Sequence, residues 1–334
     1  MQRFTESDRP VLVTGGAGFI GGHLVEALSR AGHRVRVLDD LSTGLAATVQ
    51  DLPGVRLVRG SVLDAGDVSR AAEGTGLVIH LAGVVGMRLA AEMADHAYRV
   101  GREGTDTVLR HTGGTPVVLV SSSAVYGLSD GSSPLDDELP VDRSVPLAYD
   151  GGAPGYATGK WEMERLGLDA AARRPVLIVR PFNVVGPRQS GRYGMVLPTF
   201  WGQAQAGVAL TVHGDGSQRR CFTDVGQFIG RLRELCAAPR AWQARRPLYN
   251  IGSVTSTSIT ELAALVLKAT GGTAGITHVP YESVFPGRVD VTGRVPRVDR
   301  LRDLTGETVW LPAASIVAKM LADRTGKTPE PHCG

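Results

Sequence analysis

An apolar strand that runs directly into a glycine-rich turn constrains the fold of this chain more than any other feature. Residues 11–14 read Val-Leu-Val-Thr, and Gly15, Gly18 and Gly21 follow before an amphipathic segment that extends to residue 31. The spacing differs by one residue from the Gly-x-Gly-x-x-Gly fingerprint, but glycine again permits a tight turn, and the first turn of the helix offers amide donors to a phosphate. An isolated glycine-rich turn is often only a turn. After a strand and before a helix, it predicts a site for a dinucleotide pyrophosphate.

The rest of the first half alternates between strand and helix signals. Short apolar runs predict strands at residues 35–38, 55–59, 77–81, 117–120, 176–179 and 248–251. Amphipathic patterns predict helices at residues 156–173 and 225–236. Strands that are apolar throughout and separated by helices are typical of a parallel sheet covered on both faces. The predicted fold class is therefore α/β, a doubly wound parallel Rossmann sheet with a smaller C-terminal substrate-binding domain.

The alternation ends after Pro181, where Gly, Pro and Arg become frequent. Because 334 residues exceed the usual length of one domain, we divide the chain in two. The dinucleotide-binding domain comprises residues 1–181 and 222–252. The smaller domain comprises residues 182–221 and 253–325, with helices expected at 197–205, 259–270 and 313–322. Residues 326–334 are expected to form a loose tail.

Composition argues against several classes of protein. The net charge of +3 arises from charges of both signs scattered along the chain, without the basic block that would indicate a nucleic acid or membrane partner. No stretch approaches the length of a membrane-spanning helix, and residues 1–10 lack the apolar core of a signal peptide. Cys221, Cys236 and Cys333 have neither metal-ligand spacing nor the even number that a disulfide framework needs. We predict a cytoplasmic protein with free thiols and no metal.

A carboxylate at the end of the second strand indicates which dinucleotide is bound. Asp39 lies 18 residues beyond Gly21, where it can accept both ribose hydroxyls of NAD and would repel the 2′-phosphate of NADP. The run His80-Leu81-Ala82-Gly83 ends the expected fourth strand. Its small side chains would leave room for the ribose and nicotinamide, although it could also be an ordinary turn. We therefore favour NAD over NADP.

A tyrosine and a lysine four residues apart provide the candidate catalytic groups. Tyr156 and Lys160 share one face of the predicted helix, and Ser121-Ser122-Ser123 closes the fifth strand. A free tyrosine has a pKa of about 10, which a nearby ammonium and a positive nicotinamide ring would lower toward neutral pH. A serine hydroxyl could share a hydrogen bond with the tyrosine and a substrate oxygen. The alternative is an ordinary surface pair on an amphipathic helix.

These motifs, in this order, resemble the extended short-chain dehydrogenase/reductase family, in particular its nucleotide-sugar epimerases and dehydratases, and most of all UDP-hexose (glucose or glucuronate) 4-epimerases. The matching segments span almost the whole chain: Gly15-x-x-Gly18-x-x-Gly21, Asp39 to Gly44, Ser121 to Gly127, Tyr156-x-x-x-Lys160, Arg180 to Gln189, Gly214 to Phe222 and Pro286 to Arg288. The resemblance implies NAD as the cofactor, a nucleotide sugar (a UDP-sugar) as the substrate, and a homodimer formed through helices expected at residues 88–110 and 156–173.

The resemblance also implies roles for individual residues. The expected catalytic residues are Ser122, Tyr156 and Lys160. The expected cofactor-binding residues are Gly15, Gly18, Phe19, Ile20, Gly21, Asp39, Asp40, Ser42, Thr43, Gly44, Ser61, Val62, Leu81, Ala82, Gly83, Tyr156 and Lys160. The expected substrate-binding residues are Ser122, Ser123, Asn183, Arg188, Arg192, Val196, Arg220 and Arg288, with Arg220 and Arg288 on the diphosphate.

Two departures from the family pattern bear on the reaction. Dehydratases and decarboxylases of the family carry a glutamate, often after an aspartate, where this chain has Ser123 and Ala124. No carboxylate is then available there to take a proton from C5 or to assist loss of water, which favours epimerisation or simple oxidoreduction. Other departures fall on Ser61, Gly101, Gly159 and Cys221, where the family usually has an acid, an asparagine, a serine and an aspartate.

We therefore predict an NAD-dependent nucleotide-sugar 4-epimerase for a UDP-hexose or UDP-hexuronate. Tyr156 would take the proton of the sugar 4-hydroxyl, and the 4-keto sugar would turn in the pocket and regain hydride on its other face. The alternatives are a nucleotide-sugar 4-ketoreductase or oxidoreductase and a non-catalytic NAD-binding sensor. Arg192 is a candidate for gripping the C6 carboxylate of a uronate, although it could instead be solvated or reach phosphate as Arg188 would.

Overall fold

The computed structural model describes residues 9–287 and 289–323 and is built around one seven-stranded parallel sheet. The strand order is β11-β6-β5-β4-β1-β2-β3, and each neighbouring pair is parallel. The strands are β1 (Val11–Thr14), β2 (Val35–Asp39), β3 (Val55–Arg59), β4 (Leu77–His80), β5 (Val117–Val120), β6 (Val176–Pro181) and β11 (Leu248–Ile251). The predicted Rossmann fold class is confirmed, and the last strand returns to the main sheet as expected.

Helices cover both faces of this sheet because its strands are apolar on both sides. Val11 and Val13 of β1 face one hydrophobic core, and Leu12 between them faces the other, as the alternation of side chains in a strand requires. The first face is covered by α2 (Phe19–Arg30), α10 (Val225–Ala237), α11 (Pro239–Gln243) and α14 (Asp299–Thr305). The second is covered by α3 (Ala65–Ala72), α5 (Ala94–Arg99), α6 (Thr105–His111) and α8 (Tyr156–Ala171).

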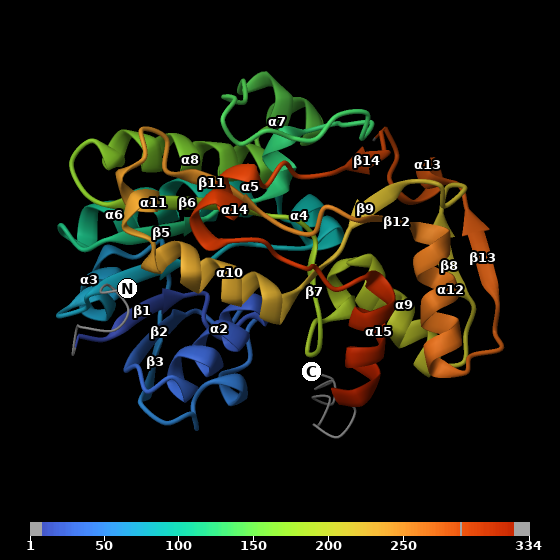
Figure 1. Ribbon diagram of the computed structural model, residues 1–334, viewed down its shortest axis with the longest axis horizontal. Coiled ribbons are helices and arrows are strands. Elements are labelled where there is room, and N and C mark those ends of the chain that lie inside the picture. The colour runs from blue at the N-terminus through green and yellow to red at the C-terminus, as the bar shows by residue number, and fades with distance from the viewer. Residues whose placement is uncertain (1–8, 288, 324–334) are drawn as a thin grey trace.

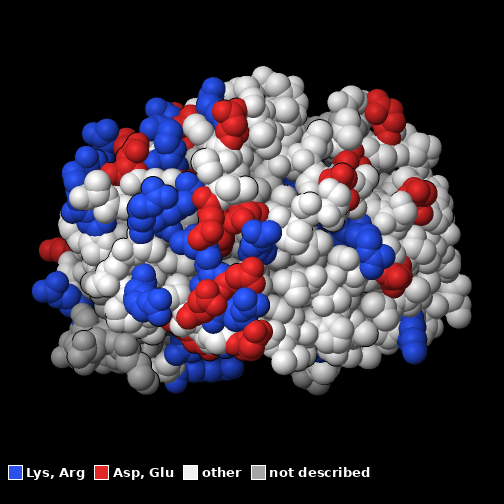
Figure 2. Space-filling model, turned by 45° about the horizontal axis from the view of Figure 1, so that its top comes forward, with Lys and Arg blue, Asp and Glu red and all other residues white. Residues whose placement is uncertain are grey.

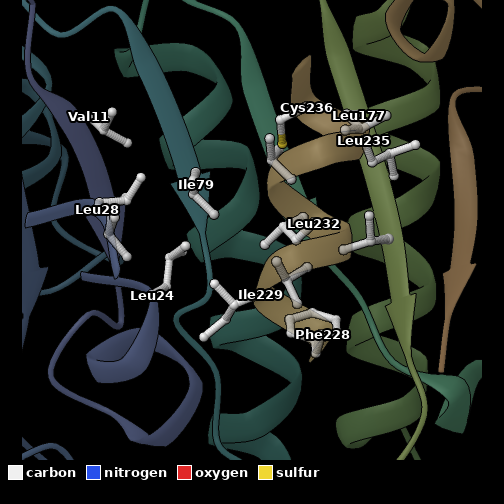
Figure 3. Close-up of a cluster of buried hydrophobic side chains, with 14 of the residues drawn as sticks. Val11, Leu24, Leu28, Ile79, Leu177, Phe228, Ile229, Leu232, Leu235 and Cys236 are labelled. Carbon is white, nitrogen blue, oxygen red and sulfur yellow. The ribbon is translucent and has the colours of Figure 1, made fainter. Parts of the chain in front are cut away.

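Figure 3 shows part of the first core, where Leu24 and Leu28 of α2 and Ile229 and Leu232 of α10 lie against the sheet. These side chains are all 5% exposed or less, so they fix the helix that follows the glycine-rich turn relative to the strands. Burying a side chain of this size contributes about 1.5–3 kcal/mol. The core therefore holds rigidly the turn on which the predicted cofactor site depends.

A smaller part lies beside the sheet, on the right in Figure 1. Its own core is formed by α9 (Val196–Gln205), α12 (Ile259–Thr270), α15 (Ala313–Ala322) and the parallel pair β8 (Leu210–His213) and β13 (Ile276–Val279). Short strands connect the two parts: β7 (Val184–Val185) pairs with β10 (Thr223–Asp224), and β9 (Arg219–Cys221) lies between β12 (Ser256–Ser258) and β14 (Gly293–Arg294). The remaining short helices are α4 (Met87–Glu92), α7 (Ser144–Tyr149) and α13 (Tyr281–Val284).

Two segments differ from the sequence prediction. The segment 253–325 was assigned to the smaller domain, but α14 within it packs against α10 and β11, because Leu301 belongs to the core of the main sheet. The helix expected at 88–110 is divided into α4, α5, a π-helical stretch at Val100–Gly104 and α6. The predicted loose tail, Cys333 and Arg288 lie outside the described residues.

Charges of both signs are interspersed over the sheet-bearing part on the face that Figure 2 shows, and fewer lie over the smaller part. Within the described ranges, no helix is long and apolar enough to cross a membrane. Cys221 and Cys236 are both buried free thiols.

Candidate active site

A cavity of about 470 Å³ opens at the carboxyl ends of the sheet strands. The strand order reverses between β1 and β4, and crevices for ligands form at such a switch point in open α/β sheets. The cavity is lined by the turns after β1, β2, β3, β4 and β5, by the first turns of α2 and α8, and by residues 289–291 and 294 from the smaller part.

The glycine-rich turn after β1 leaves no room for a side chain at Gly15 or Gly21. Gly15 has a φ of +69°, and a Cβ on Gly21 would lie 2.1 Å from the carbonyl oxygen of Gly15. The helix α2 begins after Gly18, and no described side chain caps its first turn. The backbone amides of that turn are therefore available to a ligand. Gly18, Phe19, Ile20 and Gly21 all line the cavity. An uncapped helix start behind a glycine turn fits a dinucleotide pyrophosphate.

The loops after β2 and β3 supply the other expected cofactor residues. One oxygen of Asp39 accepts the amide of Ala17 and the other accepts the amide of Leu41, each at 2.9 Å. Burial raises the pKa of Asp39, and these two amides oppose that shift. The carboxylate therefore joins the glycine-rich turn to the loop after β2. Asp40, Ser42, Thr43, Ser61 and Val62 also line the cavity.

Gly44 has a different position from the one expected. It does not line the cavity; instead, a Cβ there would lie 2.9 Å from Ala17. The missing side chain therefore lets the loop after β2 pack against the glycine-rich turn.

The start of α8 brings the three expected catalytic residues together. Asp150 accepts the amides of Gly155, Ala157 and Thr158 and so fixes the first turn of the helix. Tyr156 in this turn is hydrogen-bonded to the side chain of Ser122, which follows β5. Lys160 lies one turn further along the helix and is 3% exposed. All three side chains line the same cavity, so the structure agrees with their predicted proximity.

Burial dominates the titration of the two ionisable groups. It lowers the pKa of Lys160 to about 8, and the charge of Glu164 opposes this shift. Burial raises the pKa of Tyr156, and the hydrogen bond from Ser122 opposes it. The sequence-based expectation of a lowered tyrosine pKa is therefore not met by the protein alone, and the positive nicotinamide ring would have to provide the lowering.

Residues at the ends of β5 and β4 hold Lys160 in place. Its Nζ donates to the carbonyl oxygen of Val120 at 2.8 Å, and a Cβ on Gly83 would lie only 3.4 Å from the same atom. His80 is buried between Thr14 at 2.7 Å and Thr105 at 3.2 Å. Burial and the charge of Lys160 lower the pKa of His80 to about 3, so it is a neutral structural link. Leu81, Ala82 and Gly83 line the cavity.

The expected substrate-binding residues are only partly brought together. Ser122, Ser123, Asn183, Arg188 and Arg220 line the cavity. Arg188 has a φ of +64° and forms an ion pair with Glu26 at 2.7 Å. Arg220 pairs with Asp290 at 3.0 Å.

The expectation for Arg192 and Val196 is not supported. Arg192 lies on a short 3₁₀ turn (Gly191–Tyr193), is exposed, and does not line the cavity; its carbonyl oxygen accepts a hydrogen bond from Arg88. The neighbouring Ser190 and Tyr193 line the cavity instead. Val196 begins α9 and packs against the core of the smaller part.

Two departures from the family pattern form one structural feature. A Cβ on Gly101 would lie 2.8 Å from the carbonyl carbon of Gly159, and a Cβ on Gly159 would lie 3.0 Å from the Cα of Tyr98. The π-helical stretch and α8 thus approach each other backbone to backbone.

Another departure from the family pattern, Cys221, is fully buried, and burial raises its pKa to about 12, so it is not a reactive thiol.

The cavity residues that sequence reasoning missed include Tyr149, Asp150 and Arg294. Asp150 had a readable signal, because a carboxylate shortly before a helix start is a typical cap. Tyr149 and Arg294 had none, since they lie far apart in segments without a regular pattern. Among the described residues, no three His, Cys, Asp or Glu side chains form a group that could hold a metal ion.

Comparison with known proteins identifies the family. Residues 11–252 match the model of the NAD dependent epimerase/dehydratase family. The chain is 33% identical to a UDP-N-acetyl-alpha-D-glucosaminuronate decarboxylase of Bacillus cytotoxicus, over 88% of this chain and 90% of the relative. It is 30% identical to a dTDP-glucose 4,6-dehydratase of Streptomyces niveus, over 81% and 80% of the two chains.

Among solved structures, an epimerase of Methanothermobacter thermautotrophicus superposes with a TM-score of 0.83 at 25% identity, covering 95% of this chain and 92% of the other. The sheet order, the cofactor cavity and these matches agree with one another. The chain belongs to the NAD-dependent epimerase/dehydratase family of nucleotide-sugar enzymes.

Proposed function

We propose that this chain is an NAD-dependent nucleotide-sugar 4-epimerase that acts on a UDP-hexose or UDP-hexuronate through a transient 4-keto sugar. The observation that carries the proposal is that Ser122, Tyr156 and Lys160 share a cavity in which each described carboxylate already has a partner within the protein. A 4-epimerase needs a base at the 4-hydroxyl and nothing further at C5 or C6.

The engagement of the carboxylates distinguishes the possible reactions. The described carboxylates that line the cavity are Asp39, Asp40, Asp150 and Asp290. Asp39 and Asp150 accept backbone amides, Asp40 accepts the amide and hydroxyl of Ser42, and Asp290 pairs with Arg220. Loss of water, or reprotonation of C5 after loss of carbon dioxide, needs a positioned acid or base near C5. Ser123 and Ala124, beside the catalytic serine, offer no carboxylate.

The side chains of the site have complementary roles in this scheme. Tyr156 accepts the proton of the 4-hydroxyl and later returns it, while Ser122 holds the same oxygen. Lys160 provides a positive charge close to the tyrosine, and Arg220 holds the diphosphate while the sugar turns, since a guanidinium can bind phosphate bidentately. NAD, when bound, would supply both the acceptor and the donor of hydride, so that no net oxidation would occur.

A second candidate is decarboxylation of a nucleotide uronate. It is favoured by the 33% identity to a UDP-N-acetylglucosaminuronate decarboxylase. The two candidates differ in their products, because only decarboxylation releases carbon dioxide and leaves a pentose.

A product analysis without added cofactor tests the proposal. Purified protein is incubated with UDP-, dTDP- and GDP-sugars, including UDP-glucose, UDP-glucuronate and UDP-N-acetylglucosaminuronate, and the products are followed by NMR. We expect the 4-epimer of a UDP-sugar and no carbon dioxide, and the Tyr156→Phe protein prepared identically should form product at least about a hundredfold more slowly. A UDP-pentose with carbon dioxide, or a 4-keto-6-deoxy sugar, would overturn the epimerase assignment.

The choice of cofactor is predicted to depend on Asp39. Replacing Asp39 with alanine should weaken discrimination against NADP, because the carboxylate that would repel the 2′-phosphate is lost. Cofactor released from denatured wild-type protein should be NAD, and titration of the cofactor-free variant should show a smaller NAD-to-NADP affinity ratio. Asp51→Ala is the matched control, since Asp51 is exposed and does not line the cavity. Release of NADPH alone would refute the role of Asp39.

A further inference from the structure

We propose that Arg294 and Tyr149 form a binding subsite for an anionic group on the sugar, the C6 carboxylate of a nucleotide hexuronate. This inference rests on the proposed nucleotide-sugar substrate but does not depend on which reaction follows. It replaces Arg192, which the structure leaves exposed, as the candidate for selecting a uronate.

Sheet pairing places Arg294 beside the arginine expected to hold the diphosphate. Strand β14 runs parallel to β9, and Arg294 pairs in register with Arg220. Residues paired on neighbouring strands direct their side chains to the same face of a sheet. Both arginines accordingly line the cavity.

The two arginines differ in their partners. Arg220 forms an ion pair with Asp290, whereas Arg294 has no described carboxylate within ion-pair distance. Arg294 is only 8% exposed, its Nη2 donates to the carbonyl oxygen of Gly127, and its Nε is buried without a hydrogen-bond partner. The guanidinium lies 4.8 Å from the ring centre of Tyr149.

An unpaired buried charge is costly, so such groups are normally paired or coordinated. The buried Arg180 follows this rule, because it forms an ion pair with Glu164 at 2.6 Å. Burial lowers the pKa of Arg294, although a hydrogen bond with Tyr149 and the charge of Asp290 oppose this shift. The partners present therefore offset only part of the cost of burying this charge. An anionic ligand in the cavity would supply the missing partner.

The position of Arg294 indicates which part of the substrate it would meet. Arg220 marks the diphosphate end of the site, and Tyr156 marks the sugar C4. Burial has the largest effect on the pKa of Tyr156, followed by the hydrogen bond with Ser122, and the charge of Arg294 has a smaller effect. Arg294 is therefore close enough to Tyr156 to act on it. Arg294 thus lies between the two ends, beside the sugar ring.

A hexose linked through C1 and reacting at C4 carries its other substituents at C2, C3 and C6. In a hexuronate the anion is the C6 carboxylate, whereas a neutral hexose offers only hydroxyls at these positions. A guanidinium fork matches a carboxylate bidentately, and Tyr149 could add a hydroxyl donor. The competing explanation is that Arg294 is a second diphosphate ligand beside Arg220.

Equilibrium binding to the Tyr156→Phe protein with its NAD separates these explanations, because no turnover changes the ligand. The probes are UDP, UDP-glucose and UDP-glucuronate, measured by calorimetry on this background alone and combined with Arg294→Gln, Arg294→Lys or Tyr149→Phe. We expect UDP-glucuronate to bind more tightly than UDP-glucose. Arg294→Gln should weaken UDP-glucuronate by roughly tenfold or more, the scale of a lost charged hydrogen bond, and leave UDP within about threefold.

Arg294→Lys should restore part of the preference because it keeps the charge without the fork. Melting temperature and NAD content report whether each variant is folded. Equal weakening of UDP and UDP-glucuronate would assign Arg294 to the diphosphate and overturn the proposal. The proposal would also be overturned if the Tyr156→Phe protein with Arg294 intact bound UDP-glucuronate no more tightly than UDP-glucose. This measurement does not depend on whether an Arg294 variant folds. Failure of the epimerase assignment would instead appear in the products and would leave these affinities unchanged.

Discussion

Replacing Tyr156 with phenylalanine is expected to lower turnover by a factor of about a hundred or more while leaving the fold and the bound NAD nearly unchanged. A positioned acid or base typically contributes a factor of about 10²–10⁴ to the rate. The substitution removes one hydroxyl from a side chain that otherwise stays packed at the start of α8. Ser122 keeps a second contact, because its Oγ still accepts the amide of Ala124 at 3.1 Å. Steady-state rates and NAD released on denaturation are the measurements.

A second tyrosine provides the control. Tyr98 on α5 does not line the cavity, so Tyr98→Phe should retain its rate within a few-fold. If Tyr156→Phe kept more than about a hundredth of the wild-type rate, Tyr156 would not be the general base. A large loss of NAD or of melting temperature in the same variant would mean that the hydroxyl has a structural role.

The core of the fold could be predicted because its signal is local. The strands β1, β3, β5 and β11 begin and end where their apolar runs do, and the bounds of α12 and α15 also match the prediction. Each of these segments packs against a hydrophobic core on one or both sides, so its sequence carries the pattern of its surroundings. The short strands β9 and β14 carry no such pattern, because their pairing depends on residues far apart in the chain.

The site follows the same rule. Ser122, Tyr156 and Lys160 belong to segments with a recognisable order of residue types, and the structure brings them together. Tyr149 and Arg294 meet only because α7 and β14 fold against the same cavity. The exposed position of Arg192 has a related cause: nearness in sequence to a cavity segment does not fix the direction of a side chain on a short turn.

Replacing Glu164 with alanine is expected to destabilise the protein by about 3–5 kcal/mol, the usual cost of removing one partner of a buried ion pair. Glu164 on α8 accepts two hydrogen bonds from Arg180, at 2.8 and 2.6 Å, and one from Ser121 at 2.6 Å. The side chain of Arg180 is fully buried and that of Glu164 is 4% exposed. Without Glu164, Arg180 would retain its charge beside the ring of Tyr126, 4.5 Å away, and under the weaker attraction of Asp137. Urea unfolding measures the loss.

Asp169 on the same helix is the matched control, because its ion pair with Arg165 at 3.1 Å is largely exposed. Asp169→Ala should cost less than about 1 kcal/mol. The double variant Glu164→Leu with Arg180→Met should recover much of the stability lost in Glu164→Ala, since apolar residues can replace a buried ion pair at little cost. The recovered protein should still turn over more slowly than wild type, because Glu164 also binds Ser121, the residue before the catalytic Ser122. If Glu164→Ala lost less than about 1 kcal/mol of unfolding free energy, water or a rearranged side chain would have to satisfy Arg180. The Arg180–Glu164 pair would then not be the link between β6, α8 and the catalytic serine.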